Sequence, residues 1–241
     1  MKSVDISLEQ STYPLFIISD IHANLPALRA VLDEIPDEAD VICAGDLLGY
    51  YTEPNEVCEL LRQRGVYCIK GNHDKYVLDE LSYADSRESK YRIQPTKAQL
   101  SEDNTRWVAS LPDTLHISLA AAGKGGAVTT LQVSHGSPVS VEEYIYKDTP
   151  ITFEWPGSVD YLVLGHTHHP IRRATDQGVI INPGSVGQVR DRVPGAAYAS
   201  FSLATREVTF HRAVYDVTAY QQQLRQRAID EAMIDILSRV H

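Results

Sequence analysis

The sequence predicts an α/β fold in which two β-sheets pack face to face and helices lie outside them. The first half alternates short apolar runs with helical patterns, which indicates a parallel sheet built from βαβ units. The second half carries two hairpin patterns and ends in a long amphipathic segment. The 241 residues contain no low-complexity linker and no repeat, so we expect one domain over residues 1–241.

Buried strands and amphipathic helices alternate in the first half. Continuous apolar runs of four or five residues are typical of strands that are covered on both faces. The first helical pattern has Asn24 as its N-cap and Pro36 as its stop. The predicted elements are strands at 15–18, 40–44 and 66–70, helices at 25–35 and 56–64, and a loop at 50–55.

Residues 76–111 are predicted to form a lid-like excursion over the active face. The part from 76 to 94 is polar, carries tyrosines and has no clear periodicity, and long insertions of this kind often act as lids. Residues 96–111 have a helical pattern that ends at Pro112, and we expect Trp107 to pack in the core.

Strands dominate the second half. Two runs flank a glycine-rich turn at 123–126 and predict a hairpin, and two further runs flank a turn at 204–206. The predicted elements are strands at 115–119, 128–134, 161–164, 179–181, 196–203 and 207–213, followed by an amphipathic helix at 220–240.

Composition restricts the partners. A formal net charge of −10 and a pI near 5.3 disfavour nonspecific nucleic-acid binding, because an acidic surface repels phosphate backbones. A phosphorylated substrate stays compatible, since bound cations reverse the local field. The first 14 residues have two acidic side chains and no apolar h-region, so we expect no signal peptide, and no run is long enough for a membrane span.

The three cysteines lack Cys-x-x-Cys spacing, which indicates reduced thiols and a cytoplasmic compartment. Cys43 and Cys68 lie in apolar runs and are predicted to be small core residues. A catalytic thiol is the minor alternative.

Ligand-type side chains follow five of the predicted strands. In a twisted sheet such strand ends converge in one crevice, and Asp and His are the usual ligands of Mn, Fe and Zn. Each alone has an ordinary structural interpretation as a helix cap or a buried histidine, but five strand ends carry them. The residues are Asp20, His22, Asp46, Asn72, His73, Asp74, His135, His166 and His168.

This set is too large for one ion and suits two ions about 3.5–4 Å apart. His22 stands two residues after Asp20, and His168 stands two after His166, so each pair can direct two ligands at one point. Asp46 is isolated on the central turn and is the aspartate best placed to bridge the two ions.

The ordered motifs resemble the full signature of the calcineurin-like metallophosphoesterase superfamily. They are Asp20-x-His22, Gly45-Asp46, Gly71-Asn72-His73-Asp74, His135-Gly136 and Gly165-His166-Thr167-His168. Within that superfamily the sequence is most similar to the small bacterial and archaeal phosphodiesterases, which the segment 182–188 also resembles. The fold that the resemblance implies is a four-layer α/β/β/α sandwich of two mixed sheets flanked by helices.

The resemblance also implies a role for each matching residue. Asp20, His22 and His168 would hold the first metal ion, Asp46 would bridge, and Asn72, His135 and His166 would complete the second site. His73 would not be a ligand but would contact the phosphate or protonate the leaving oxygen, and Asp74 would hold its ring in place. Two divalent cations, Mn²⁺ first and Fe, Ni, Co or Zn as alternatives, would lower the pKa of a bridging water, and the resulting hydroxide would attack the phosphorus.

Other polar and aromatic residues have two open interpretations. Arg190 or Arg192 either clamps a substrate phosphate or forms a solvated surface pair, and the resembling branch often has an arginine where Arg190 stands. Tyr50 and Tyr51 either line the pocket or pack in the core.

The predicted function is therefore hydrolysis of small phosphate esters, phosphodiesters rather than monoesters alone, by a metal-dependent phosphoesterase, with Asn72, His73 and Arg190 contacting the substrate. One alternative is a metal-binding scaffold without turnover, since the resembling fold also serves in protein-sorting complexes. Another is a nuclease that acts on nucleic-acid ends. The filled position of His73 favours the enzyme.

Overall fold

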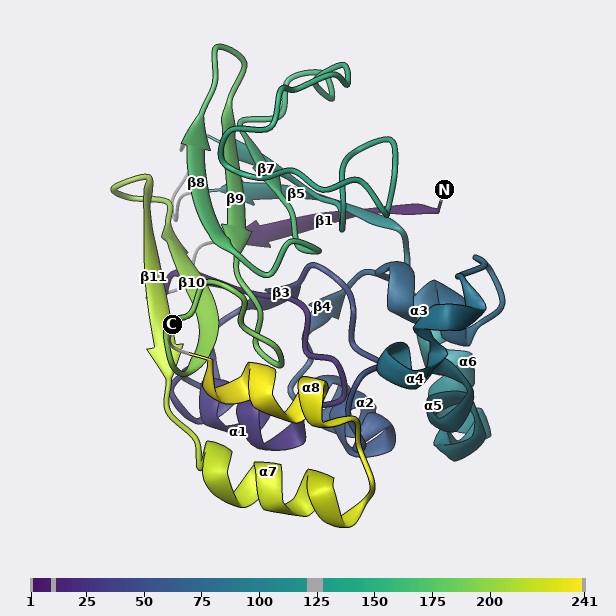
Figure 1. The fold of residues 1–241 in the computed structure, drawn as a ribbon. Coiled ribbons are helices and arrows are strands. Elements are labelled where there is room, and N and C mark those ends of the chain that lie inside the picture. Colours follow the sequence, from purple (N-terminus) through teal and green to yellow (C-terminus); the bar gives the residue numbers. More distant parts are fainter. Residues whose placement is uncertain (1, 10–11, 121–127, 240–241) are drawn as a thin grey trace.

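The computed structural model describes residues 2–9, 12–120 and 128–239. Two mixed β-sheets pack against each other, as Figure 1 shows. The five-stranded sheet has the order β11-β10-β2-β3-β4. Its strands are β2 (Leu15–Ile18), β3 (Val41–Cys43), β4 (Tyr67–Cys68), β10 (Ala196–Ser202) and β11 (Glu207–Ala213).

The six-stranded sheet has the order β1-β5-β6-β7-β9-β8. β6, β7 and β9 run parallel in it, as β2, β3 and β4 do in the other sheet. Each sheet therefore presents the carboxyl ends of several strands at one edge. The strands are β1 (Ser3–Glu9), β5 (Thr114–Ala120), β6 (Val128–Val133), β7 (Tyr161–Val163), β8 (Pro170–Ala174) and β9 (Val179–Pro183).

The core between the sheets consists of aliphatic and aromatic side chains from the facing sides of both. Ile17 and Ile42 of one sheet meet Ile117, Leu131 and Val163 of the other, and all are at most 1% exposed. This burial removes apolar surface from water and holds the two sets of strand ends in a fixed relation.

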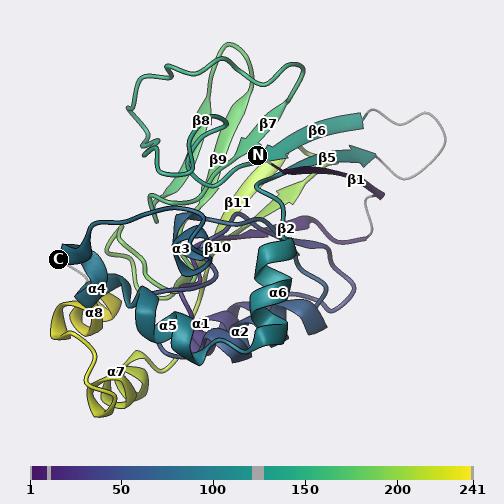
Figure 2. The ribbon, with the colours of Figure 1, turned by 90° about the vertical axis from the view of Figure 1, so that its right-hand side faces the viewer.

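Helices gather on the side of the five-stranded sheet, below it in Figure 1 and again in Figure 2. A second core cluster fills the space between this sheet and the helices. The helices are α1 (Leu25–Asp33), α2 (Pro54–Gln63), α3 (Asn72–Val77), α4 (Glu88–Tyr91), α5 (Ile93–Gln99), α6 (Glu102–Ser110), α7 (Val217–Gln226) and α8 (Glu231–Asp235), with 3₁₀ turns η1 (Asp85–Arg87) and η2 (Ile236–Ser238).

The outer face of the six-stranded sheet is covered by a loop rather than by helices. Phe153 and Trp155 of the segment 137–160 pack on Leu162, Leu164 and Ile180. The two mixed sheets and the flanking helices confirm the predicted α/β sandwich class. Of the two helical layers that the resemblance implied, the described residues form the one on the five-stranded sheet, and this long loop takes the place of the other.

Two strands were not predicted, and each of two predicted helices is divided into two shorter ones. β1 is an edge strand that alternates polar and apolar residues, and β8 is a short partner of β9. Ser101 accepts a hydrogen bond from the Asn104 amide and starts α6 within the predicted helix 96–111. Asp230 similarly starts α8 within the predicted helix 220–240, after Ala228 adopts a positive φ of 54°. In both cases a capping side chain competes with continuation of the helix.

Most other elements appear where the sequence predicts them. β5 and β6 pair as the antiparallel hairpin, although its turn at 123–126 lies outside the described residues. Trp107 is partly buried against the helical core. Within the described part of the chain, no helix combines the length and the apolar character that crossing a membrane requires.

Candidate metal centre

The predicted ligand residues converge at the edge where the strands of both sheets end. Asp20 and His22 follow β2, Asp46 follows β3, and the remaining ligands follow β4, β6 and β7. All are buried, at no more than 6% exposure. Their ligand atoms form two compact groups, which are Asp20, His22 and His168, and Asp46, His135 and His166.

The first group has the spacing of ligands around a single ion. His22 Nε2 lies 3.1 Å from His168 Nε2, and Asp20 Oδ1 lies 3.3 Å from the same His168 nitrogen. Bonds of 2.0–2.2 Å to a divalent ion place neighbouring ligand atoms ~3.0–3.5 Å apart. The third pair, Asp20 Oδ1 and His22 Nε2, is 3.9 Å apart, so the three side chains surround a space for one ion.

Asp46 joins the first group to the second. Its Oδ2 atom is 3.7 Å from His22 Nε2 and 3.3 Å from His135 Nε2. Asn72 Oδ1 lies 3.1 Å from the same His135 nitrogen. One carboxylate oxygen thus faces both groups, as a bridging ligand must in a two-ion site.

Each predicted histidine ligand is held by a backbone carbonyl at one ring nitrogen. The contacts fix the tautomer and aim the other nitrogen, as second partners of metal-binding histidines commonly do. Nδ1 is anchored in three of them, while His166 is anchored through Nε2 and so offers Nδ1. The pairs are His22 with Leu48 at 3.0 Å, His135 with Ala44 at 2.7 Å, His168 with Gln188 at 2.6 Å and His166 with Glu142 at 3.2 Å.

Five of the seven predicted ligands adopt left-handed backbone conformations. Non-glycine residues rarely do so, although Asp and His tolerate it better than most. Each costs of order 1–3 kcal/mol and persists only where the surrounding structure enforces it. The residues are Asp20, His22, Asp46, His166 and His168, with φ between 52° and 66°. The strain concentrates where the chemistry is expected.

Electrostatics favours neutral imidazoles at most of the site. Burial lowers the pKa of His22 and of His166 to about 3. Burial also disfavours protonation of His135, but the adjacent Asp46 carboxylate outweighs it and raises the His135 pKa to about 10. His135 and His73 in turn hold the Asp46 pKa well below its usual range against the effect of burial. A cation held by His135 would therefore displace a proton.

His73 lies at the centre of an aromatic cluster beside the ligands. Its ring centroid is 4.9 Å from that of His22, 4.7 Å from Tyr50 and 4.5 Å from Tyr91. Its buried Nδ1 has no hydrogen-bond partner among the described residues. The His73 amide donates to Asp46 Oδ1 at 2.8 Å, so the residue is tied to the carboxylate that faces both groups.

Asp74 does not hold the ring of His73, contrary to the role that the resemblance implied. Its carboxylate accepts hydrogen bonds from the backbone amides of Leu47, Leu48 and Gly71, at 2.9–3.3 Å. These bonds join the turn after β3 to the turn after β4. Because three amide donors already surround the carboxylate, Asp74 organises the backbone that carries Asp46 instead of an imidazole.

Replacing Asp74 with alanine is accordingly expected to lower the free energy of unfolding by about 2–4 kcal/mol, because buried amides lose their acceptor. Urea denaturation of the metal-free protein measures this. Unchanged stability combined with a loss of turnover would return Asp74 to the ring-orienting role.

Gly71 makes the close approach of these two turns possible. A Cβ atom at this position would collide with the carboxylate and the backbone nitrogen of Asp46. Gly71 has an extended backbone, so space rather than φ requires glycine here. The glycine of this motif thus places the Asp46 turn against the start of α3.

The structure distinguishes between the paired residues that the sequence left open. Tyr50 contacts His22 and His73, whereas Tyr51 is 1% exposed and packs with Tyr220. Arg190 donates to the Tyr50 hydroxyl at 3.2 Å, while Arg192 is exposed.

Several residues near the site carried no usable signal in the sequence. Tyr144 packs on His166 with a centroid separation of 4.0 Å, and Tyr91 packs on His73. The backbone carbonyl of Glu142 anchors His166. These residues lie in loops or in a short helix, where no strand end marks them.

The cysteines are far less suited to chemistry. All three are free and buried. Burial raises the pKa of the Cys58 and Cys68 thiols, which disfavours thiolate at neutral pH. Cys43 and Cys68 pack in the core as predicted.

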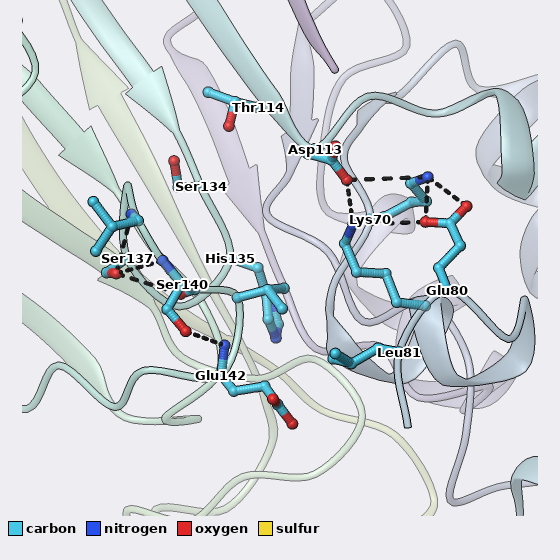
Figure 3. Close-up of a pocket in the computed structure, with 13 residues that line it drawn as sticks. Lys70, Glu80, Leu81, Asp113, Thr114, Ser134, His135, Ser137, Ser140 and Glu142 are labelled. Atoms are coloured by element: carbon cyan, nitrogen blue, oxygen red, sulfur yellow. Dashed lines mark hydrogen bonds and ion pairs between the residues drawn. The ribbon is translucent and has the colours of Figure 1, made fainter. Parts of the chain in front are cut away.

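A cavity of about 290 Å³ lies beside His135, and Figure 3 shows it. Lys70, Glu80 and Asp113 lie on one wall, opposite Ser137 and Ser140. Lys70 Nζ is 2.7 Å from Glu80 Oε2, and the neighbouring Lys75 pairs with Asp113. Both lysines of this cavity are therefore paired with carboxylates.

The fold and the buried ligand groups together define a two-sheet protein with a candidate dinuclear metal site. Residues 14–206 match the calcineurin-like phosphoesterase superfamily domain. The chain belongs to this superfamily, and the predicted family is confirmed.

Similar proteins include three that match this chain over most of its length. An uncharacterized protein of Methanocaldococcus jannaschii is 32% identical over 234 residues, which cover 88% of this chain and 92% of that protein. The crystal structure of a metallophosphoesterase from Sphaerobacter thermophilus is 31% identical with a TM-score of 0.72, and the match covers 96% of this chain and 100% of that one. A hypothetical protein of Pyrococcus horikoshii shares the fold with a TM-score of 0.76 at 21% identity, over 95% and 98% of the two chains.

Proposed function

We propose that this protein is a metal-dependent phosphoesterase that hydrolyses small phosphate esters, diesters in particular, at a site for two divalent ions. The observation that carries the proposal is the carboxylate of Asp46, which faces both ligand groups at 3.3–3.7 Å. Superfamily membership and the buried Asp and His groups support it.

The ions would be held by Asp20, His22 and His168 on one side and by Asn72, His135 and His166 on the other, with Asp46 between them. When bound, two such ions neutralise phosphoryl oxygens and acidify a water molecule. We propose Mn²⁺ as the native ion, with Fe, Ni, Co and Zn as alternatives that the same ligands accept.

His73 is proposed to contact the phosphate and to protonate the leaving oxygen. Its ring lies beside the ligand groups without being anchored to a carbonyl, in contrast to the four predicted histidine ligands. Burial lowers its pKa to about 3. The ring can therefore carry a proton to donate only when an anionic phosphate lies beside it and raises this pKa. Arg190 is proposed to contact the substrate beyond the reacting phosphate.

A segment of the chain itself is proposed to cover this site. In the proposed lid, residues 76–111, Tyr91 packs on His73 and Tyr76 donates to the Glu142 carboxylate on the opposite side.

We infer that the whole chain acts as one domain. Its three free cysteines favour a cytoplasmic compartment, and its net charge of −10 disfavours nonspecific nucleic-acid binding.

Hydrolysis of bis-p-nitrophenyl phosphate tests the proposal. The purified protein with Mn²⁺ is expected to release p-nitrophenol, and a chelator is expected to abolish the release. Absence of turnover with each of Mn²⁺, Fe²⁺, Co²⁺, Ni²⁺ and Zn²⁺ would refute the enzyme and favour a scaffold.

A further inference from the structure

A second cavity adjoins the candidate metal centre through Tyr50. It encloses about 270 Å³ and is lined by Tyr50, Tyr91, Tyr144 and three basic side chains. The Tyr50 ring also contacts His22 and His73, with centroid separations of 4.5 and 4.7 Å. The cavity therefore lies one tyrosine ring away from the predicted ligands.

The three basic side chains of this cavity, Arg87, Lys90 and Arg190, have no carboxylate within 4.0 Å among the described residues. Acidic groups beside them in the sequence are already engaged. Glu88 accepts from the Tyr83 hydroxyl and the Gln94 amide, and Asp191 pairs with Arg212. Three cations without counter-ions in a chain of net charge −10 leave a local positive field.

The cavity beside His135 provides the contrast. There Lys70 is paired with Glu80, as the dashed lines in Figure 3 show. Lys75 is paired with Asp113 and Glu80. An anion entering that cavity would have to compete with these carboxylates. The two cavities thus differ in whether their basic side chains are paired with carboxylates, and unpaired basic side chains stabilise a second negative charge better.

Arg190 is fixed in place before any ligand arrives. Its Nη2 donates to the Tyr50 hydroxyl at 3.2 Å and to Gln188 Oε1 at 3.0 Å. The backbone carbonyl of Gln188 in turn anchors His168 at 2.6 Å. A guanidinium held in this way loses little side-chain entropy when it binds an anion.

The C-terminal segment completes the wall of the cavity. Met233 of α8 and Ile236 of η2 line it, and the Tyr51 hydroxyl holds this segment by donating to the Met233 carbonyl at 3.1 Å. The superfamily match ends at residue 206. This wall therefore lies in a part of the chain beyond the matched domain.

We propose that this cavity binds a second anionic group of the substrate, so that the preferred substrates are phosphodiesters that carry another phosphate beyond the one that reacts. The inference rests on the proposed function. In the reaction, water adds to phosphorus, the bond from phosphorus to the leaving oxygen breaks, and the alcohol departs with a proton. The second phosphate is unchanged and serves only for binding.

Two matched esters test the proposal, namely the 5′-p-nitrophenyl ester of thymidine 5′-monophosphate with and without a 3′-phosphate. The wild-type protein is expected to have about tenfold higher kcat/KM for the 3′-phosphorylated ester, through charge-assisted contacts. In R87Q/K90Q this preference is expected to fall to about twofold or less, while kcat/KM for bis-p-nitrophenyl phosphate stays unchanged. High salt is expected to reduce the wild-type preference as well.

The matched control is R29Q/R206Q, which removes the same charge from exposed positions outside the cavity. It is expected to keep the full preference. Equal kcat/KM for both esters in the wild type, or an undiminished preference in R87Q/K90Q, would overturn this inference and leave the proposed function standing.

Calorimetry of the Mn²⁺-loaded protein separates the two proposals if turnover is absent. Thymidine 3′,5′-bisphosphate is expected to bind about tenfold more tightly than thymidine 5′-monophosphate, and less so in R87Q/K90Q. Such binding without hydrolysis would reject the proposed function and keep the cavity. Equal binding of the two nucleotides would reject the cavity.

Discussion

Replacing Asp46 with asparagine is expected to lower kcat/KM for bis-p-nitrophenyl phosphate by about a thousandfold, or roughly 4 kcal/mol of transition-state stabilisation. The substitution keeps the shape of the side chain but removes the charge between the two ligand groups. Without that charge the bound metal should fall from two ions per chain to one or fewer. Kinetics and elemental analysis of the same preparation measure both effects.

A suitable control is Asp5→Asn on β1, which changes the same charge at an exposed position on the other sheet. It should leave metal content and turnover unaltered. If Asp46→Asn retained two ions and nearly full activity, Asp46 would not be the bridging ligand, and the pairing of the two groups would need another explanation.

His73→Ala is expected to leave two ions bound and to lower kcat by roughly 10²–10⁴-fold for esters with poor leaving groups. Protonation of the departing oxygen matters most for an alkoxide, so the loss should be smaller for p-nitrophenyl esters than for methyl esters. Comparing kcat for both kinds of ester in the wild type and the variant measures this difference.

Metal content decides between the two possible roles of His73. A ring atom of this residue lies close enough to His22 and Asp46 to form a third group of potential ligands. Loss of one ion in His73→Ala would therefore make His73 a ligand. Retention of both ions with an equal loss for all esters would point to phosphate binding without proton transfer.

The sequence was most informative where local pattern and chemistry coincide. Asp20, Asp46 and His135 each follow an apolar strand, so the predicted sheet brings them together once its strand ends are aligned. The same reasoning predicted the βαβ units and the hairpins, because each depends on residues that are close in the chain. The edge strand β1 was missed, although its alternation of polar and apolar residues would have identified it.

The remaining features depend on contacts between distant segments. Asp74 follows His73 directly, yet it bonds to the amides of Leu47 and Leu48, some 26 residues earlier. The anchoring of His166 through Nε2 depends on the Glu142 carbonyl, which lies 24 residues earlier in the loop before β7. Likewise, Met233 and Ile236 of the C-terminal segment line the cavity next to Tyr50, more than 180 residues later in the chain. No local sequence pattern predicts such long-range contacts.

Titration of the metal-free protein with Mn²⁺, with turnover and bound metal recorded at each step, tests the central claim most directly. Two ions per chain are predicted, with hydrolysis of bis-p-nitrophenyl phosphate rising until the second ion is bound. Full activity at one ion, or two bound ions without any hydrolysis, would contradict a two-ion phosphoesterase.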